Sequence, residues 1–138
     1  MRVEASRELL APVEDVWEFV AEPHHLRDWW PGLAAVDPDR RGTSPGARWR
    51  IVADSNPSLF RRPSSTGTLL VNAAEPRRRF AFELPDERLH ADVRLQSQGN
   101  RTLVRLAVEG PFLLGSRRTL ARNALKRLYD LCQTAAEL

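Results

Sequence analysis

The apolar and polar positions of this chain follow two different periods, and the changes between them predict the order of its elements. Residues 2–10 alternate in the manner of a strand with one buried face. Residues 13–20 then repeat apolar side chains at helical spacing after Pro12, a residue that suits the start of a helix. This helix must stop before Pro23, and a second short helix is predicted from residue 24 to about residue 30.

The stretch from residue 33 to residue 110 is predicted to form an antiparallel series of strands. Turn residues interrupt it at short intervals, and no long segment of helical period separates the runs. Apolar side chains recur at every second position, as in Phe80, Phe82 and Leu84, so each strand has one apolar face. The candidate strands are residues 48–53, 69–73, 80–84, 89–95 and 103–108.

Residues 113–138 are predicted to form one long amphipathic helix, because they contain no proline and no glycine after Gly115. Strands with one apolar face need a cover, and this helix can supply it. The fold class is therefore α+β, with an antiparallel sheet of about six or seven strands covered by the terminal helix. We expect a single domain over residues 1–138. The helix positions expected to face the sheet are Ala121, Leu125, Leu128 and Cys132.

Four stretches of the sequence carry a resemblance to a known family. They are Ala11-Pro12-Val13-Glu14-Asp15-Val16-Trp17-Glu18-Phe19-Val20, His25-Leu26-Arg27-Asp28-Trp29-Trp30-Pro31-Gly32, Glu75-Pro76-Arg77-Arg78-Arg79-Phe80-Ala81-Phe82 and Thr102-Leu103-Val104-Arg105-Leu106. Together they resemble the START and Bet v 1-like (SRPBCC) superfamily, and more narrowly its polyketide cyclase/dehydrase and lipid transport family. The resemblance implies a helix-grip fold, in which the curved antiparallel sheet wraps around the long terminal helix, with two short helices after the first strand. It also implies a deep cavity between sheet and terminal helix, which in different branches binds lipids, sterols, polyketides or hormones and occasionally catalyses cyclisation.

Composition and charge exclude several other classes of protein. The hydrophobic share of 42% and the charged share of 28% are those of a globular domain, and no apolar run approaches the roughly 20 residues of a membrane span. A net charge of +3, with no aromatic stacking platform beside the basic runs, argues against nucleic acid as a partner. Because the single Cys132 has no partner within the chain, we expect a cytoplasmic location.

Side chains with catalytic or metal-binding chemistry are sparse in the sequence. The glycines are scattered and form no phosphate-binding loop, and no Gly-x-Ser-x-Gly motif frames a serine nucleophile. His24 and Asp28 have the spacing of two ligands on one helix, but zinc sites normally need three or four. We therefore expect neither a metal nor a cofactor.

The candidate ligand-binding residues are apolar side chains on the inner face of the predicted sheet. We expect the cavity to be walled by Trp49, Leu70, Phe82, Val93 and Leu106, with Trp30 near its entrance. Trp29 and Trp30 are about 100° apart on a helix. Either one packs inward and the other lines the cavity mouth, or both belong to the core.

Arg117 is a separate candidate, because it falls on the apolar side of the terminal helix and within its first turns. A cation is disfavoured there by the helix dipole. Either the aliphatic part of the side chain carries the guanidinium out to solvent, or the guanidinium lies at the cavity edge, where it can bind a carboxylate or phenolate of the ligand.

The most direct interpretation is reversible binding of a small hydrophobic or amphipathic molecule, such as a lipid, a polyketide or an aromatic metabolite. One alternative is a cofactor-independent polyketide cyclase or dehydratase, which would hold a reactive chain in a productive shape. Another is a protein-interaction module like the Hsp90 ATPase activator homologues, which similarly carry a Trp-Trp pair near the second helix, although here Pro31-Gly32 replaces their usual Gly-Pro. Stable membrane insertion is not expected, and the sequence leaves the oligomeric state open.

Overall fold

A computed structural model describes residues 1–53, 65–111 and 119–137 of the chain. The elements are β1 (Arg2–Leu9), α1 (Val13–Ala21), α2 (Pro23–Trp29), β2 (Leu33–Asp37), β3 (Arg48–Ala53), β4 (Ser65–Glu75), β5 (Arg79–Leu84), the 3-10 helix η1 (Pro85–Glu87), β6 (Leu89–Gln98), β7 (Arg101–Glu109) and α3 (Leu120–Glu137). This order confirms the predicted sequence of one strand, two short helices, a series of strands and a terminal helix.

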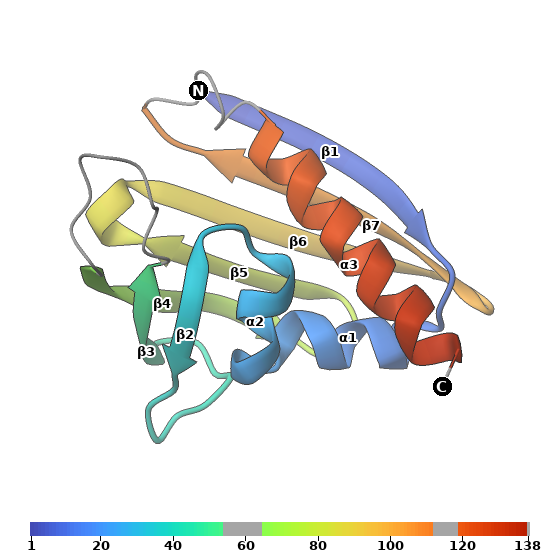
Figure 1. The fold of residues 1–138 in the computed structure, drawn as a ribbon, viewed down its shortest axis with the longest axis horizontal. Helices are drawn as coiled ribbons and strands as arrows, with labels where there is room; N and C mark the ends of the chain where they lie inside the picture. The colour runs from blue at the N-terminus through green and yellow to red at the C-terminus, as the bar shows by residue number, and fades with distance from the viewer. Residues whose placement is uncertain (54–64, 112–118, 138) are drawn as a thin grey trace.

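The described strands form one antiparallel sheet in the order β1-β7-β6-β5-β4-β3-β2. Each strand from β2 to β6 pairs with the next one along the chain, while β1 pairs with β7 and forms the edge opposite β2. Figure 1 shows the sheet curving behind α3, with α1 and α2 on the same side of it as α3. The architecture is the predicted helix-grip fold.

Local sequence explains where the two short helices begin and end. Pro12 immediately precedes α1, and Glu14 and Asp15 lie in its first turn, where negative charge favours the positive end of the helix dipole. α1 ends at Ala21, ahead of Pro23, as predicted. The carboxylate of Glu22 then accepts a hydrogen bond from the backbone N–H of His24 at 3.3 Å, which caps α2. The two helices are therefore separate elements with a sharp turn between them.

The terminal helix packs its apolar stripe toward the sheet. Ala121, Leu125, Leu128 and Cys132 are each no more than 2% exposed, which confirms the predicted facing of these four positions. α3 lies along β1 and β7 and also contacts α2. The predicted start of the helix at residue 113 lies outside the described residues.

The inner face of the sheet, which faces the helices, is built of apolar side chains at alternating positions. On β6, Leu89, Ala91 and Val93 point inward and are buried, whereas His90 points outward and is exposed. Among the described core residues Thr102 is polar, and its hydroxyl donates to the carbonyl oxygen of Ala11 at 2.8 Å. No helix in the described parts of the chain has the length and apolar content needed to cross a bilayer.

Candidate functional site

Four of the predicted wall residues lie on the inner face of the sheet, as expected from their alternation. Trp49 of β3, Phe82 of β5, Val93 of β6 and Leu106 of β7 are all buried. Val93 and Leu106 lie directly opposite each other in the β6–β7 register, so their side chains share a face. These positions therefore converge on the side of the sheet that carries the helices.

Leu70 does not lie on this inner face, which corrects the prediction. It pairs with Arg48 on β3 and with Glu83 on β5, and both partners belong to the outer face of the sheet. Its chain neighbours Leu69 and Val71 are the buried residues of this part of β4. Leu69, Leu70 and Val71 are all apolar, so the sequence alone does not show which of them point to the inner face. The pairing of Leu69 with Trp49 places Leu69 on the inner face and Leu70 on the outer face.

Both tryptophans at the end of α2 are buried in the core, which decides between the two alternatives for this pair. Trp29 is 0% exposed, and its indole N–H donates to the carbonyl oxygen of Phe19 at 3.1 Å. Trp30 is 2% exposed, and its ring meets the ring of Phe82 edge-on, with centroids 5.1 Å apart. Trp30 is therefore part of the packed interior, and it does not line an open entrance.

These rings belong to a larger group that we call the inner aromatic cluster. Its members are Trp17, Trp29, Trp30, Trp49, Phe80 and Phe82. The planes of Trp49 and Phe80 are stacked at 25° with centroids 5.8 Å apart, and Phe80 and Phe82 lie 5.6 Å apart. The cluster thus joins α1 and α2 to the inner faces of β3 and β5 through ring contacts.

Backbone hydrogen bonds hold two of the indoles in this cluster. In addition to the bond from Trp29, the indole N–H of Trp49 donates to the carbonyl oxygen of Gly42 at 2.7 Å. Gly42 lies in the segment between β2 and β3, where its positive φ of 58° suits glycine. Because their polar atoms are satisfied, these rings present apolar surface to the interior.

Phe80 is the residue at the centre of the cluster, and it was not among the predicted site residues. It is fully buried and contacts the rings of Trp17, Trp49 and Phe82. The alternation that places Phe80 and Phe82 on one face was visible in the sequence. The convergence of Trp17 and Trp49 on Phe80 was not, because these residues come from elements distant along the chain.

Ionisable side chains are few on the inner face of the described residues. Arg7 of β1 points toward α3, where its guanidinium carbon lies 4.4 Å from the centroid of the Tyr129 ring, a cation–π contact. Within the described residues, no group of three or more His, Cys, Asp and Glu side chains could hold a metal ion. The inner surface described here is therefore suited to apolar contact.

Cys132 is the one nucleophilic thiol in the chain, and its environment keeps it protonated. Burial on α3 raises its pKa from 9.0 to about 11, and the negative charge of Asp15 adds to the increase. The thiolate is the reactive form of cysteine, so the folded protein presents an inert thiol at neutral pH.

We expect Cys132 to react with a disulfide reagent at pH 8 about 100-fold more slowly in the folded protein than in urea. The pKa increase of about two units lowers the thiolate fraction by that factor, and burial adds shielding. The measurement is the rate of release of the coloured thiol, with the urea-unfolded chain as the control. Equal rates in both states would contradict the buried placement.

Arg117 lies outside the described residues. The proposed pairing of Arg117 with an anionic ligand group therefore stays a prediction.

The cavity expected between the sheet and the terminal helix also stays a prediction. Hollows that are bordered by described residues include three on the outer face of the sheet and one of about 480 Å³ beside α1, where Trp17, Glu18 and Thr43 border it.

The whole length of the chain can be compared with known families. The family described as polyketide cyclase/dehydrase and lipid transport matches it over residues 1–134. The chain belongs to this family. Among curated proteins, none matches it significantly.

Solved structures show the same fold at low sequence identity. Protein NE0264 from Nitrosomonas europaea is 17% identical, with a TM-score of 0.73 over 100% of this chain and 97% of that one. TTHA0849 from Thermus thermophilus is 16% identical, with a TM-score of 0.73 over 99% of both chains. The Bet v 1 homologue Ara h 8.0201 is 9% identical, with a TM-score of 0.71 over 97% of this chain and 98% of that one. These likenesses establish the Bet v 1-like fold of the family member described here.

Proposed function

We propose that this domain reversibly binds a small hydrophobic or amphipathic molecule, of the class of a lipid, a polyketide or an aromatic metabolite. The ligand would lie between the inner face of the sheet and α3. The observation that carries the proposal is the inner aromatic cluster, because aromatic and aliphatic surface on a concave sheet is the usual lining of a small-molecule site. The family description, which includes lipid transport, agrees with it.

The residues proposed to contact the ligand are inner-face positions of four strands, together with Trp30 at the end of α2. They are Trp30, Trp49, Phe82, Val93 and Leu106, to which Phe80 is added and from which Leu70 is removed. Buried aromatic rings provide apolar area, and stacked or edge-on geometry suits a flat or elongated guest. Arg117 is retained on sequence grounds as a partner for a carboxylate or phenolate of the ligand.

A binding role has more support than turnover in this domain. A cyclase or dehydratase of this family would need acid and base groups facing the ligand. The described inner face offers the cation Arg7 beside Tyr129 and the protonated thiol of Cys132, neither of which is placed as a general base. The described residues therefore support apolar recognition more directly than proton transfer.

The interaction-module alternative has less support from the same residues. The adjacent tryptophans that suggested it are both buried, with Trp29 hydrogen bonded to Phe19 and Trp30 packed on Phe82. A docking patch needs exposed apolar surface, which these two side chains do not provide. The free, buried thiol of Cys132 fits the proposed cytoplasmic location.

The proposal predicts that apolar ligands change the tryptophan fluorescence of the protein. We expect saturable quenching or a spectral shift on titration with a series of fatty acids and a flat polycyclic aromatic. Phe82→Leu should raise the dissociation constant of the best ligand by about fivefold or more, because it removes a ring contact worth about 1 kcal/mol. The measurement is the dissociation constant from the titration curve.

The matched control is Leu70→Ala, which shortens an apolar side chain on the outer face of the neighbouring strand β4. We expect it to change the dissociation constant by less than about twofold, since it lies on the opposite side of the sheet. Equal losses in the two variants, or no saturable response to any of these ligands, would count against binding at the inner face.

A further inference from the structure

The outer face of the sheet carries three arginines in direct cross-strand register. Arg79 of β5 lies opposite Arg94 of β6, and Arg94 lies opposite Arg105 of β7. We call these three residues the arginine row. Directly opposed residues on antiparallel strands have Cα atoms about 5 Å apart, and like charges in this position are destabilising. Such an arrangement is costly unless an anion neutralises it.

The acidic groups near the arginine row satisfy only one of its members fully. Asp92 accepts two hydrogen bonds from Arg79, from Nε at 3.1 Å and from Nη2 at 3.0 Å, and Glu75 lies 3.8 Å from the same guanidinium. Arg94 reaches Asp92 only at 3.4 Å. Within the described residues, Arg105 has no ion pair. The row therefore has cationic hydrogen-bond donors left for another anion.

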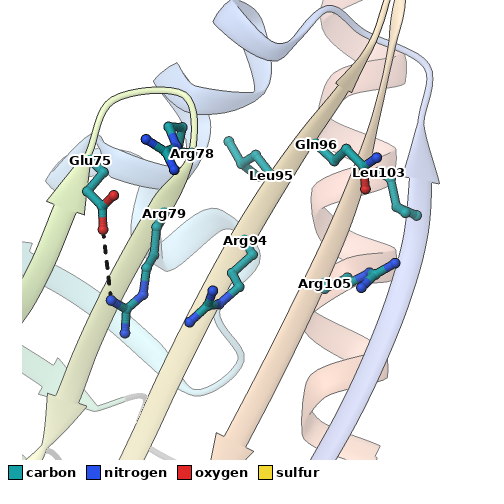
Figure 2. A pocket seen from close by; sticks show the side chains of 8 residues that line it. All are labelled: Glu75, Arg78, Arg79, Arg94, Leu95, Gln96, Leu103 and Arg105. Atoms are coloured by element: carbon teal, nitrogen blue, oxygen red, sulfur yellow. Dashed lines mark ion pairs between the residues drawn. The ribbon is translucent and has the colours of Figure 1, made fainter.

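A hollow of about 320 Å³ lies at the arginine row, with Arg78 from the β4–β5 turn at its border. Figure 2 shows the side chains of Arg78, Arg79, Arg94 and Arg105 on the same side of the sheet, away from α3. Arg78 likewise has no ion pair among the described residues. Two further hollows, of about 390 and 300 Å³, adjoin the row through Arg94, Arg105 and Arg79.

The charge of this hollow matches a phosphoryl group. The four arginines and the carboxylates of Glu75 and Asp92 together carry a formal net charge of +2. A phosphate monoester carries about −1.5 to −2 at neutral pH, whereas a single carboxylate carries −1. The planar guanidinium also binds phosphate through two parallel hydrogen bonds.

The surroundings favour a small molecule over a nucleic acid or a membrane. The lining of the hollow contains no aromatic ring on which a base could stack. On the β1 side of the row, the exposed carboxylates of Glu4, Glu8 and Glu109 lie on the same outer face and pair with Arg2 and Arg101, so this flank carries no excess of positive charge. A broad anionic surface would meet these carboxylates, whereas a compact anion would not.

We propose that the arginine row and Arg78 form a binding site for the phosphoryl group of a small molecule, separate from the apolar site on the inner face. The amide of Gln96 and the side chain of Leu103 border the same hollow and would contact the remainder of that molecule. Within the row, the guanidinium groups of Arg94 and Arg105 would supply the main hydrogen bonds, because Arg79 is already held by Asp92 through two hydrogen bonds.

Calorimetric titration with pyrophosphate at fixed, low ionic strength tests this site, since salt screens exposed charges. We expect saturable binding to the wild-type domain and a loss of about tenfold or more in affinity for the Arg94→Gln, Arg105→Gln double variant. The control is Arg48→Gln, Arg50→Gln, which removes two exposed arginines from β3 and changes the net charge equally. It should change the affinity by less than about twofold.

Three results would overturn the proposal. The first is an absence of pyrophosphate binding to the wild type. The second is an equal loss in both double variants, which would indicate a general effect of net charge. The third is binding to vesicles containing phosphatidic acid, with none to phosphatidylcholine vesicles and none to pyrophosphate, which would assign the row to a membrane surface. All four substituted arginines are exposed on the sheet. The circular dichroism spectra of both double variants should therefore match that of the wild type.

Discussion

Replacing Phe80 by alanine is expected to lower the free energy of unfolding by about 3 to 5 kcal/mol. Phe80 is fully buried, and its ring contacts those of Trp17, Trp49 and Phe82. Its removal takes away the apolar area of one ring, breaks three aromatic contacts and leaves a space in the centre of the inner aromatic cluster. Urea unfolding followed by circular dichroism measures the loss from the shift in the midpoint.

Phe19→Ala is the matched control for this substitution. Phe19 is only half-buried and makes one ring contact, an edge-on approach to His25 with centroids 5.1 Å apart. Its loss should therefore cost clearly less than that of Phe80. If the two variants were equally destabilised, Phe80 would not be the centre of the core described here.

Leu128→Ala is expected to lower the free energy of unfolding by about 2 to 5 kcal/mol. Leu128 is 0% exposed and lies in the middle of the buried stripe of α3, which packs on β1 and β7. Truncation would remove three side-chain carbon atoms and leave a cavity between the helix and the sheet, because the hydrogen bonds between the strands prevent the sheet from moving in to fill it. Thermal and urea unfolding measure the change.

Leu131→Ala tests whether the effect depends on the face of the helix. Leu131 is the same residue type on the same helix but is only partly buried. We expect its truncation to cost less than half as much as that of Leu128. A loss below about 0.5 kcal/mol for Leu128→Ala would remove this residue from the core and overturn the orientation of α3.

Periodicity predicted most of the architecture, because each element has a clear apolar face and a clear terminating residue. Pro23 separates the two short helices, and the stripe through Leu125 and Leu128 orients the terminal helix correctly. Terminating residues and apolar faces are local signals. Where such signals agree with one another, tertiary packing seldom produces a different structure. The family resemblance added the curvature of the sheet around the terminal helix.

The site was harder to predict, because it depends on register. On β4, Leu69, Leu70 and Val71 are all apolar, so the sequence alone does not say which of them points inward. A shift in pairing between Val71 and Ala73 adds an irregularity that no alternation pattern indicates. The wrong assignment of Leu70 follows from these two facts.

The arginine row illustrates the same limit on the other face of the sheet. Arg79, Arg94 and Arg105 lie on three strands, and the pattern along each strand does not show that the three are aligned. Their alignment depends on the lengths of the turns between β5, β6 and β7. The two-residue turn between Gln98 and Arg101 sets part of this register, with Gly99 at a φ of 71°.

The central claim is that a small apolar molecule binds at the inner face of the sheet, and nuclear magnetic resonance on methyl-labelled protein tests it most directly. Val93 and Leu106 report on the inner face, while Leu70 and Leu103 report on the outer face. We predict intermolecular nuclear Overhauser effects between the best ligand of the fluorescence titration and the methyl groups of Val93 and Leu106. Effects confined to Leu70 and Leu103, with none to the inner pair, would contradict it.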